Sequence, residues 1–198
     1  MIRVGVLALQ GDFSAHAATL AGLGARACEV RRVAQLAELA GLVLPGGEST
    51  ALLRLMAHEP WLDALRGFHG RGGALLGTCA GAILLARDVL GAPQQSLGLL
   101  DIGVERNAYG RQAQSFETRL DSPAFVPPLA AAFIRAPRIR RVGTGVTVLA
   151  RHAGEPVLVE QGRVLAATFH PEISGETRVH ERFLAAAQGT AAARGEEE

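Results

Sequence analysis

The stretch ALLGTCAGAILL, residues 74–85, decides the fold. Its apolar start, residues 74–76, predicts a buried strand, and residues 80–87 predict a helix. Between them, Gly77-Thr78-Cys79-Ala80-Gly81 has the G-x-C-x-G pattern of a nucleophile elbow, in which a strand turns sharply into a helix. Glycines two positions before and after the cysteine let neighbouring chain pass close by. We therefore expect Cys79 at the carboxyl end of a strand, where the positive end of the helix favours a thiolate.

Strand and helix patterns alternate through the first half of the chain. Residues 2–8 and 42–44 are apolar runs typical of buried strands, and residues 13–23 and 50–56 are typical of helices. Alternation of this kind predicts a mostly parallel sheet with helices on both faces, a three-layer α/β fold.

The second half is rich in β-forming residues. We expect strands there that extend the sheet, some of them antiparallel, at residues 114–120, 146–151, 156–161 and 164–169. A last helix is expected at residues 177–188. One domain would then cover residues 1–190, and the small acidic segment 191–198 is expected to be a disordered tail.

Composition limits the class of protein. The 198 residues are 48% hydrophobic, which suits one compact domain with a full core. Twenty basic and 19 acidic residues give a net charge of +1, so no basic footprint for nucleic acid or an anionic membrane is indicated. No apolar stretch could span a bilayer, and the chain opens as a strand rather than a signal peptide. Cys28 and Cys79 fit neither a disulfide framework nor a CxxC metal site, which favours a reducing, cytoplasmic setting.

A cysteine nucleophile needs a base, and the base needs a group that orients it. Among six histidines, only His170 comes directly after a fully apolar strand, residues 164–169, which places it at the same edge of the sheet as Cys79. Glu172 follows two residues later, so its carboxylate can reach the imidazole. We expect the remaining histidines at the surface or in helices, and Cys28 as core filler in the second strand; these histidines are His16, His58, His69, His152 and His180.

A second glycine-rich turn lies in LVLPGGEST, residues 42–50. Paired glycines expose backbone N–H groups, so Gly47 is an expected oxyanion donor beside Ala80, whose N–H follows the nucleophile. An ordinary strand–turn–helix connection is the alternative for this turn. No G-x-x-x-x-G-K-S/T or GxGxxG pattern is present, which excludes a phosphate loop and gives no sign of a dinucleotide site.

These elements together resemble the triad-type class I glutamine amidotransferases. The stretches that carry the resemblance are GVLALQGDF (5–13), LPGGEST (44–50), GTCAG (77–81), RNAYGRQ (106–112), SFE (115–117), FIRAP (133–137) and FHPE (169–172). The LQGD start and the RNAYGR segment are similar to the branch that supplies ammonia for pyridoxal 5′-phosphate synthesis. The resemblance implies a flavodoxin-like class I glutaminase architecture.

The resemblance also assigns roles to residues of the predicted site. Cys79 would attack the side-chain amide of glutamine, with His170 as base and then acid and Glu172 orienting it. Gly47 and Ala80 would stabilise the oxyanion. Glutamine would be held by a set shared between three segments: Gly47, Glu48, Ser49, Arg106, Ile134 and Arg135. No metal and no cofactor is implied.

The partner implied by the resemblance is a synthase subunit, a (β/α)₈ barrel through which the ammonia passes. Loops around Gln10 and residues 45–49 would complete the oxyanion hole when this subunit docks. No nucleic-acid or membrane partner is expected. The arginine-rich segment 135–141, with Arg138, Arg140 and Arg141, is expected to be a solvated basic loop, and a role in docking is its alternative.

Three other functions are compatible with parts of the pattern. A sister glutaminase, such as one that feeds imidazole glycerol phosphate synthesis, would use the same triad, but residues 106–112 favour the vitamin B6 branch. A non-catalytic binding domain would have no chemical reason to keep all three triad residues. Cysteine hydrolases of the small-protease or deglycase type place the acid differently from His170-Pro171-Glu172.

Overall fold

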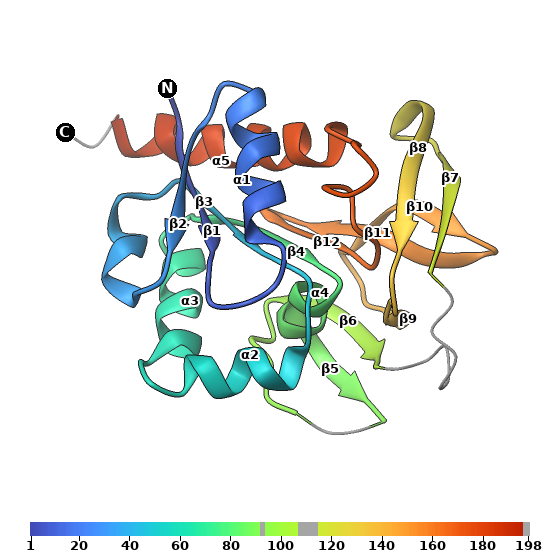
Figure 1. The fold of residues 1–198 in the computed structure, drawn as a ribbon, viewed down its shortest axis with the longest axis horizontal. Coiled ribbons are helices and arrows are strands. Elements are labelled where there is room, and N and C mark those ends of the chain that lie inside the picture. Colours follow the sequence, from blue (N-terminus) through green and yellow to red (C-terminus); the bar gives the residue numbers. More distant parts are fainter. Residues whose placement is uncertain (92–93, 107–114, 196–198) are drawn as a thin grey trace.

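A computed structural model describes residues 1–91, 94–106 and 115–195, and these build a three-layer α/β domain around a seven-stranded sheet (Figure 1). The strand order is β10-β11-β12-β4-β3-β1-β2. Five neighbouring strands run parallel: β2 (Arg26–Val30), β1 (Arg3–Leu7), β3 (Gly41–Leu44), β4 (Ala74–Thr78) and β12 (Val164–Ala167). The antiparallel strands β11 (Glu155–Gln161) and β10 (Thr147–His152) extend one edge. The order 2-1-3-4-12 is that of flavodoxin-like sheets, as the family resemblance implies.

Helices cover both faces of the sheet (Figure 1). One face carries α1 (Phe13–Gly22) and α5 (Arg178–Gly195), and the other carries α2 (Ser49–Met56), α3 (Trp61–Gly70) and α4 (Ala80–Leu85). A 3₁₀ helix, η1 (Val33–Glu38), connects β2 to β3. Each face of the sheet packs against its own apolar core, because side chains along a strand alternate between the two faces. None of the described helices is long and apolar enough to cross a membrane.

The expectation that all strands of the second half extend the central sheet is wrong in part. β7 (Phe116–Ser122) and β8 (Phe125–Phe133) form a separate hairpin. A three-stranded sheet is made by β5 (Ala86–Leu90), β6 (Leu100–Glu105) and β9 (Arg138–Val142). Helix α4 ends at Leu85, two residues before its predicted end, because the chain turns directly into β5. Burial of Leu100 and Ile102 against the core explains why these strands pack there.

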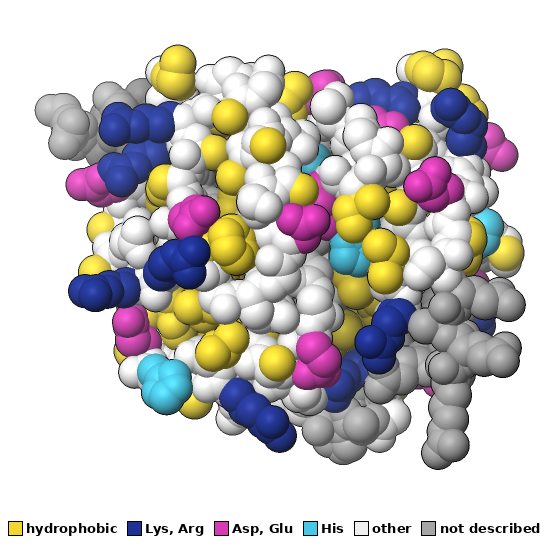
Figure 2. Space-filling view, in the orientation of Figure 1, with side chains coloured by type: hydrophobic (Ala, Val, Ile, Leu, Met, Phe, Trp, Pro, Cys, Tyr) yellow, Lys and Arg dark blue, Asp and Glu magenta, His cyan; other side chains and the backbone are white. Residues whose placement is uncertain are grey.

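The prediction of a solvated basic loop at residues 135–141 is also wrong. Arg138, Arg140 and Arg141 lie in β9, which pairs with β6. Arg140 Nε donates to Glu105 at 2.5 Å, and Arg141 Nη2 donates to Asp101 at 2.8 Å. Acidic residues on neighbouring strands thus balance the basic run, which a reading along the chain cannot reveal. On the face drawn in Figure 2, acidic and basic side chains are likewise interspersed.

The C-terminal helix is longer than predicted. It runs to Gly195, beyond the predicted end at Gln188, and residues 196–198 lie outside the described part of the chain. The division of the chain into a domain ending at residue 190 and a tail remains a prediction.

The predicted elbow between β4 and α4 has the backbone of a strained turn. Cys79 has φ 48° and ψ −102°, a conformation that non-glycine residues rarely adopt. A Cβ at Gly77 would lie 2.6 Å from the backbone of Gly81, and a Cβ at Gly81 would lie 1.9 Å from the carbonyl oxygen of Leu44. Both glycines are therefore required by close backbone contacts, as the motif predicts.

We predict that Gly81→Ala destabilises the fold by roughly 3 kcal/mol, because backbone rather than a flexible side chain occupies the space of the new Cβ. Gly70→Ala is the matched control, since nothing lies within 4 Å of a Cβ there. Urea unfolding midpoints measure the difference. Equal midpoints for the two variants would contradict the close approach of α4 to β3.

Candidate active site

Cys79 lies at the carboxyl end of β4 and is 6% exposed. Its backbone N–H donates to Ala167 of β12 at 2.9 Å, which joins the elbow to the neighbouring parallel strand. Its Sγ lies 3.9 Å from the carbonyl oxygen of Ile134. The thiol is thus held in place by the backbone, with one side open to a cleft.

His170 and Glu172 come from the loop that follows β12. The strand ends at Ala167, two residues earlier than predicted, and the His170 backbone N–H then donates to Ala132 of β8 at 2.8 Å. Glu172 Oε1 lies 2.7 Å from His170 Nδ1, and the Glu172 side chain is fully buried. The structure therefore brings the three predicted catalytic side chains to one edge of the sheet.

The environment of His170 favours its protonated form. Burial acts against the charge, but hydrogen bonds with Cys79 and Glu172 and their negative charges outweigh it and raise the pKa of His170 to about 10. At neutral pH this imidazole holds a proton between a sulfur nucleophile and a carboxylate. Such an arrangement has the geometry expected of a Cys–His–Glu triad.

A cleft of about 350 Å³ opens in front of Cys79 and His170. All six residues predicted to hold glutamine line it: Gly47, Glu48, Ser49, Arg106, Ile134 and Arg135. Ile83 and Pro137 also line the cleft and were missed by the sequence analysis. Ile83 follows Cys79 by four residues, so helical spacing could have identified it.

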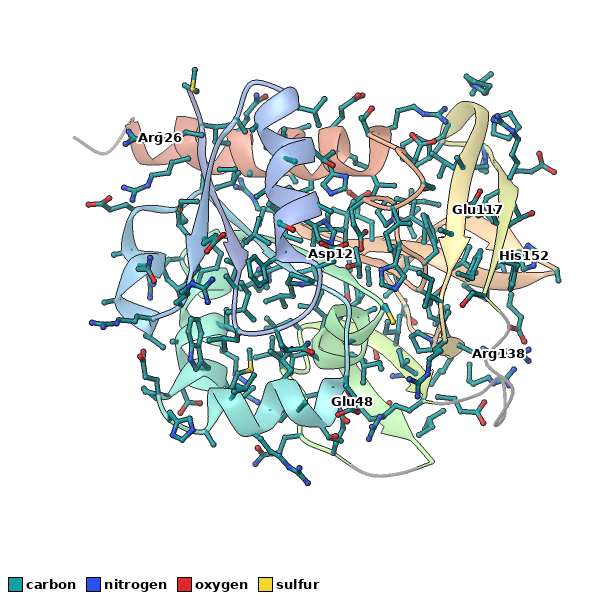
Figure 3. All side chains as sticks on the ribbon, in the orientation of Figure 1. Asp12, Arg26, Glu48, Glu117, Arg138 and His152 are labelled. Atoms are coloured by element: carbon teal, nitrogen blue, oxygen red, sulfur yellow. The ribbon has the colours of Figure 1, made fainter. Side chains whose placement is uncertain are left out.

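Glu48 and Arg106 place opposite charges at this cleft. Glu48, at the start of α2 (Figure 3), accepts hydrogen bonds from the N–H groups of Thr50 at 3.2 Å and Ala51 at 2.7 Å. Its Oε1 lies 3.3 Å from Arg106 Nη2. The hydrogen bond from the Thr50 side chain lowers the pKa of Glu48. Burial acts in the opposite direction, whereas the N–H groups of Ala51 and Thr50 and the charge of Arg106 lower the pKa further. A cation and an anion side by side suit an α-amino acid, which carries both charges.

Gln10 supports the glycine turn next to the thiol. Its Nε2 donates to the carbonyl of Gly46 at 3.4 Å, and its Oε1 accepts from the N–H of Glu48 at 3.2 Å. Gly47, between them, has φ 127°, which favours glycine. A Cβ at Gly46 would lie 2.4 Å from Cε1 of His170, so this turn packs directly on the triad.

Two other histidines lie near the triad and are not at the surface. His16 on α1 and His180 on α5 are both fully buried. Their positions on helices were predicted, but their burial was missed, although His16 and Leu20 share the four-residue spacing of a buried helix face. His152 lies at the β7–β10 end of the molecule, away from Glu48 (Figure 3), and packs on Phe116 and Phe133.

All the predicted site residues lie within the described residues, but one stretch that carries the family resemblance does not. Residues 107–112, which carry part of the family resemblance, lie outside the described residues, whereas Arg106 is inside them. Within the described ranges, no group of three or more His, Cys, Asp or Glu side chains could hold a metal ion.

Comparison with known proteins identifies the family. The model of the SNO glutamine amidotransferase family matches residues 6–188. The chain belongs to this family. A relative from Deinococcus radiodurans, named pyridoxal 5′-phosphate synthase subunit PdxT, is 53% identical over 188 residues, covering 92% of this chain and 96% of the relative. A PdxT subunit from Solibacter usitatus is 52% identical over 194 residues, covering 93% and 98%.

Solved structures support the same assignment. One described as a glutamine amidotransferase is 49% identical to this chain, with a TM-score of 0.88 over 93% of this chain and 98% of the other. A protein described as PurLQS from Thermotoga maritima, at 19% identity and a TM-score of 0.69, shares the fold. The family suggested by the sequence motifs is therefore confirmed.

We predict that Glu172→Gln lowers the pKa of His170 by about one to two units from its value of about 10, because the variant loses the carboxylate charge but keeps the side-chain shape. NMR titration of the histidine ring carbons, assigned with His170→Asn, measures the shift. Glu117→Gln, at an exposed site on β7, is the control and leaves the titration unchanged. An unchanged His170 pKa in Glu172→Gln would contradict the coupling described above.

Proposed function

We propose that this glutamine amidotransferase hydrolyses L-glutamine to L-glutamate and ammonia, and supplies the ammonia to the synthase subunit that makes pyridoxal 5′-phosphate. The single observation that carries the first part is the cleft in which Cys79 and His170 meet the Glu48–Arg106 ion pair. The second part is supported by relatives named pyridoxal 5′-phosphate synthase subunits at 53% and 52% identity over more than nine-tenths of the chain. A cytoplasmic location belongs to the same proposal, since a free thiol needs a reducing compartment.

The chemistry begins with Cys79 as nucleophile. Its thiolate attacks the side-chain carbonyl carbon of glutamine, and the resulting oxyanion accepts hydrogen bonds from the N–H groups of Gly47 and Ala80. Ala80 is the first residue of α4, so its N–H has no partner within the helix. His170, held by Glu172, then gives its proton to the departing nitrogen and ammonia leaves.

Hydrolysis of the thioester completes the cycle. His170, now neutral, takes a proton from water, and the hydroxide attacks the γ-glutamyl thioester to release glutamate and restore the Cys79 thiolate. Because Cys79 is buried apart from the side that faces the cleft, water and substrate reach the thiol from the cleft.

Substrate binding uses the charged groups at the mouth of the cleft. Arg106 faces the α-carboxylate of glutamine, and Glu48 faces its α-ammonium group. Arg106 and Glu48 remain close to each other, and Glu48 still accepts the hydrogen bond from the N–H of Ala51. Ser49, Ile134 and Arg135 also line the cleft. The positive φ of Arg135, 48°, is a strained backbone conformation at the edge of the cleft.

We predict that Arg106→Gln raises KM for glutamine about 10- to 100-fold with a smaller change in kcat. The substitution removes a charged hydrogen bond to the substrate that is present in both the ground state and the transition state. Initial-rate kinetics measure this. Arg87→Gln, an exposed arginine paired with Asp101, is the control and keeps the wild-type KM. A large loss of kcat with an unchanged KM would contradict a binding role for Arg106.

The synthase partner is expected to raise activity by ordering the turn that Gln10 supports. We predict that glutamine-dependent ammonia release by the isolated chain is slow and rises at least tenfold when a pyridoxal 5′-phosphate synthase barrel subunit is added. Cys79→Ala abolishes release in both conditions, whereas Cys28→Ala, on β2, does not. Full activity without the partner would contradict the activation, and activity in Cys79→Ala would contradict the whole proposal.

A further inference from the structure

A line of buried polar side chains continues behind the triad from Glu172. One carboxylate oxygen, Oε1, meets His170, and the other, Oε2, lies 3.4 Å from Nε2 of His16. The side chains of Glu172 and His16 are both fully buried. Within the described residues, no well-directed hydrogen bond reaches Oε2, so the imidazole of His16 is the ionisable group that faces it.

His16 is fixed by two further contacts from different elements. Its Nδ1 lies 2.9 Å from Nε2 of His180 on α5, the helix that covers the same face of the sheet as α1 (Figure 1). The two rings are 5.1 Å apart and inclined by 51°. Nε2 of His16 also lies 3.2 Å from Oγ1 of Thr78, the residue before the nucleophile. Helix α1, helix α5 and strand β4 therefore meet at this one ring.

Both rings of the pair are neutral in this setting. Burial lowers the pKa of His16 well below 6.5, and the nearby His180 and His170 lower it further. Burial also lowers the pKa of His180 to about 4, although the backbone and charge of Glu176 act in the opposite direction. A neutral His16 leaves the negative charge of Glu172 available to His170.

Neutrality restricts where the protons can be. Each neutral ring has one N–H, and the 2.9 Å contact needs one ring to donate and the other to accept. If His16 donated from Nδ1, its Nε2 lone pair would face the buried carboxylate, which is repulsive. If His180 donates from Nε2 instead, His16 carries its proton on Nε2, in hydrogen-bonding contact with Oγ1 of Thr78 and with Oε2 of Glu172 3.4 Å away.

We propose that His16, with its tautomer set by His180, is a positioning residue that presents an Nε2–H group to the outer oxygen of Glu172 and so keeps the inner oxygen on His170. His16 does not touch the substrate. It acts through the triad acid, as outer hydrogen-bond partners do at other active sites. Its kinetic consequence rests on the proposed function, whereas its effect on His170 does not.

The proton position is the direct test. Two-bond ¹H–¹⁵N correlation spectra of the purified chain, assigned with His16→Gln and His180→Gln, report which ring nitrogen carries hydrogen. We expect the Nε2–H tautomer for His16 and a neutral ring at pH 7. An Nδ1–H tautomer or a charged ring would overturn the proposal.

Substitutions at His16 separate positioning from packing. The amide nitrogen of His16→Gln can replace Nε2, whereas the shorter His16→Asn can replace only Nδ1, and His16→Leu replaces neither. We expect kcat of the His16→Gln variant within about threefold of wild type. For the His16→Asn and His16→Leu variants we expect kcat about 10- to 100-fold lower, with KM unchanged in all three. We also expect the pKa of His170 to fall by about one unit in Asn and Leu only. His69→Leu, which removes a half-buried helix histidine bonded to Gly73, is the control.

The outcomes distinguish failure of this proposal from failure of the proposed function. If the His16→Asn and His16→Leu variants match His16→Gln in both kcat and the pKa of His170, the His16 side chain contributes only packing and the proposal is overturned. If the wild type does not turn over glutamine but the His170 pKa shifts as described, the positioning role stands and the glutaminase function fails. Thermal unfolding of every variant shows whether a loss of kcat comes from a loss of fold; in that case the His170 pKa of the folded fraction decides.

Discussion

The close passage of backbone around Cys79 is the constraint on which the rest of the site depends. Strand β4 turns into α4 through one residue of positive φ, and the first turn of α4 rests on the carbonyl of Leu44 at the position of Gly81. This contact brings the end of β3, and with it the glycine turn at residues 46–47, beside the thiol. The hydrogen bond from Cys79 to Ala167 brings the end of β12, and with it His170, to the other side. Cys79, His170 and the glycine turn are therefore neighbours because three parallel strands end together.

Burial then gives these groups their chemistry. The side chain of Glu172 is shielded from water, and its negative charge and hydrogen bond stabilise the protonated imidazole of His170. The pKa of His170 is therefore raised, although burial alone would lower it. Burial also lowers the pKa values of His16 and His180, and there the neighbouring carboxylates, Glu172 beside His16 and Glu176 near His180, do not outweigh it. Groups of one residue type thus take different protonation states within one polar cluster, according to their partners.

Sequence reasoning located the elbow, the strand before His170 and the glycine turn, because each depends on local pattern: apolar runs, glycine spacing and an adjacent acid. It failed where pairing between distant segments decides the outcome. The arginines of β9 were expected in a loop because their partners Glu105 and Asp101 are over thirty residues away in the chain. The contacts that bury the ring of His16 are also distant along the chain, since Thr78 on β4 and His180 on α5 are 62 and 164 residues away. Arg106 was selected only through family resemblance, and its contact with Glu48 supplies the physical reason.

The central claim, that Cys79 forms a γ-glutamyl thioester, has one direct measurement. Acid quenching of the working complex during glutamine turnover, followed by peptide mass spectrometry, locates any covalent intermediate. The account predicts a mass increase of one γ-glutamyl group on the peptide that contains Cys79, and none on the peptide that contains Cys28. Turnover of glutamine with no adduct on Cys79 in rapidly quenched samples, or an adduct on Cys28 instead, would contradict it.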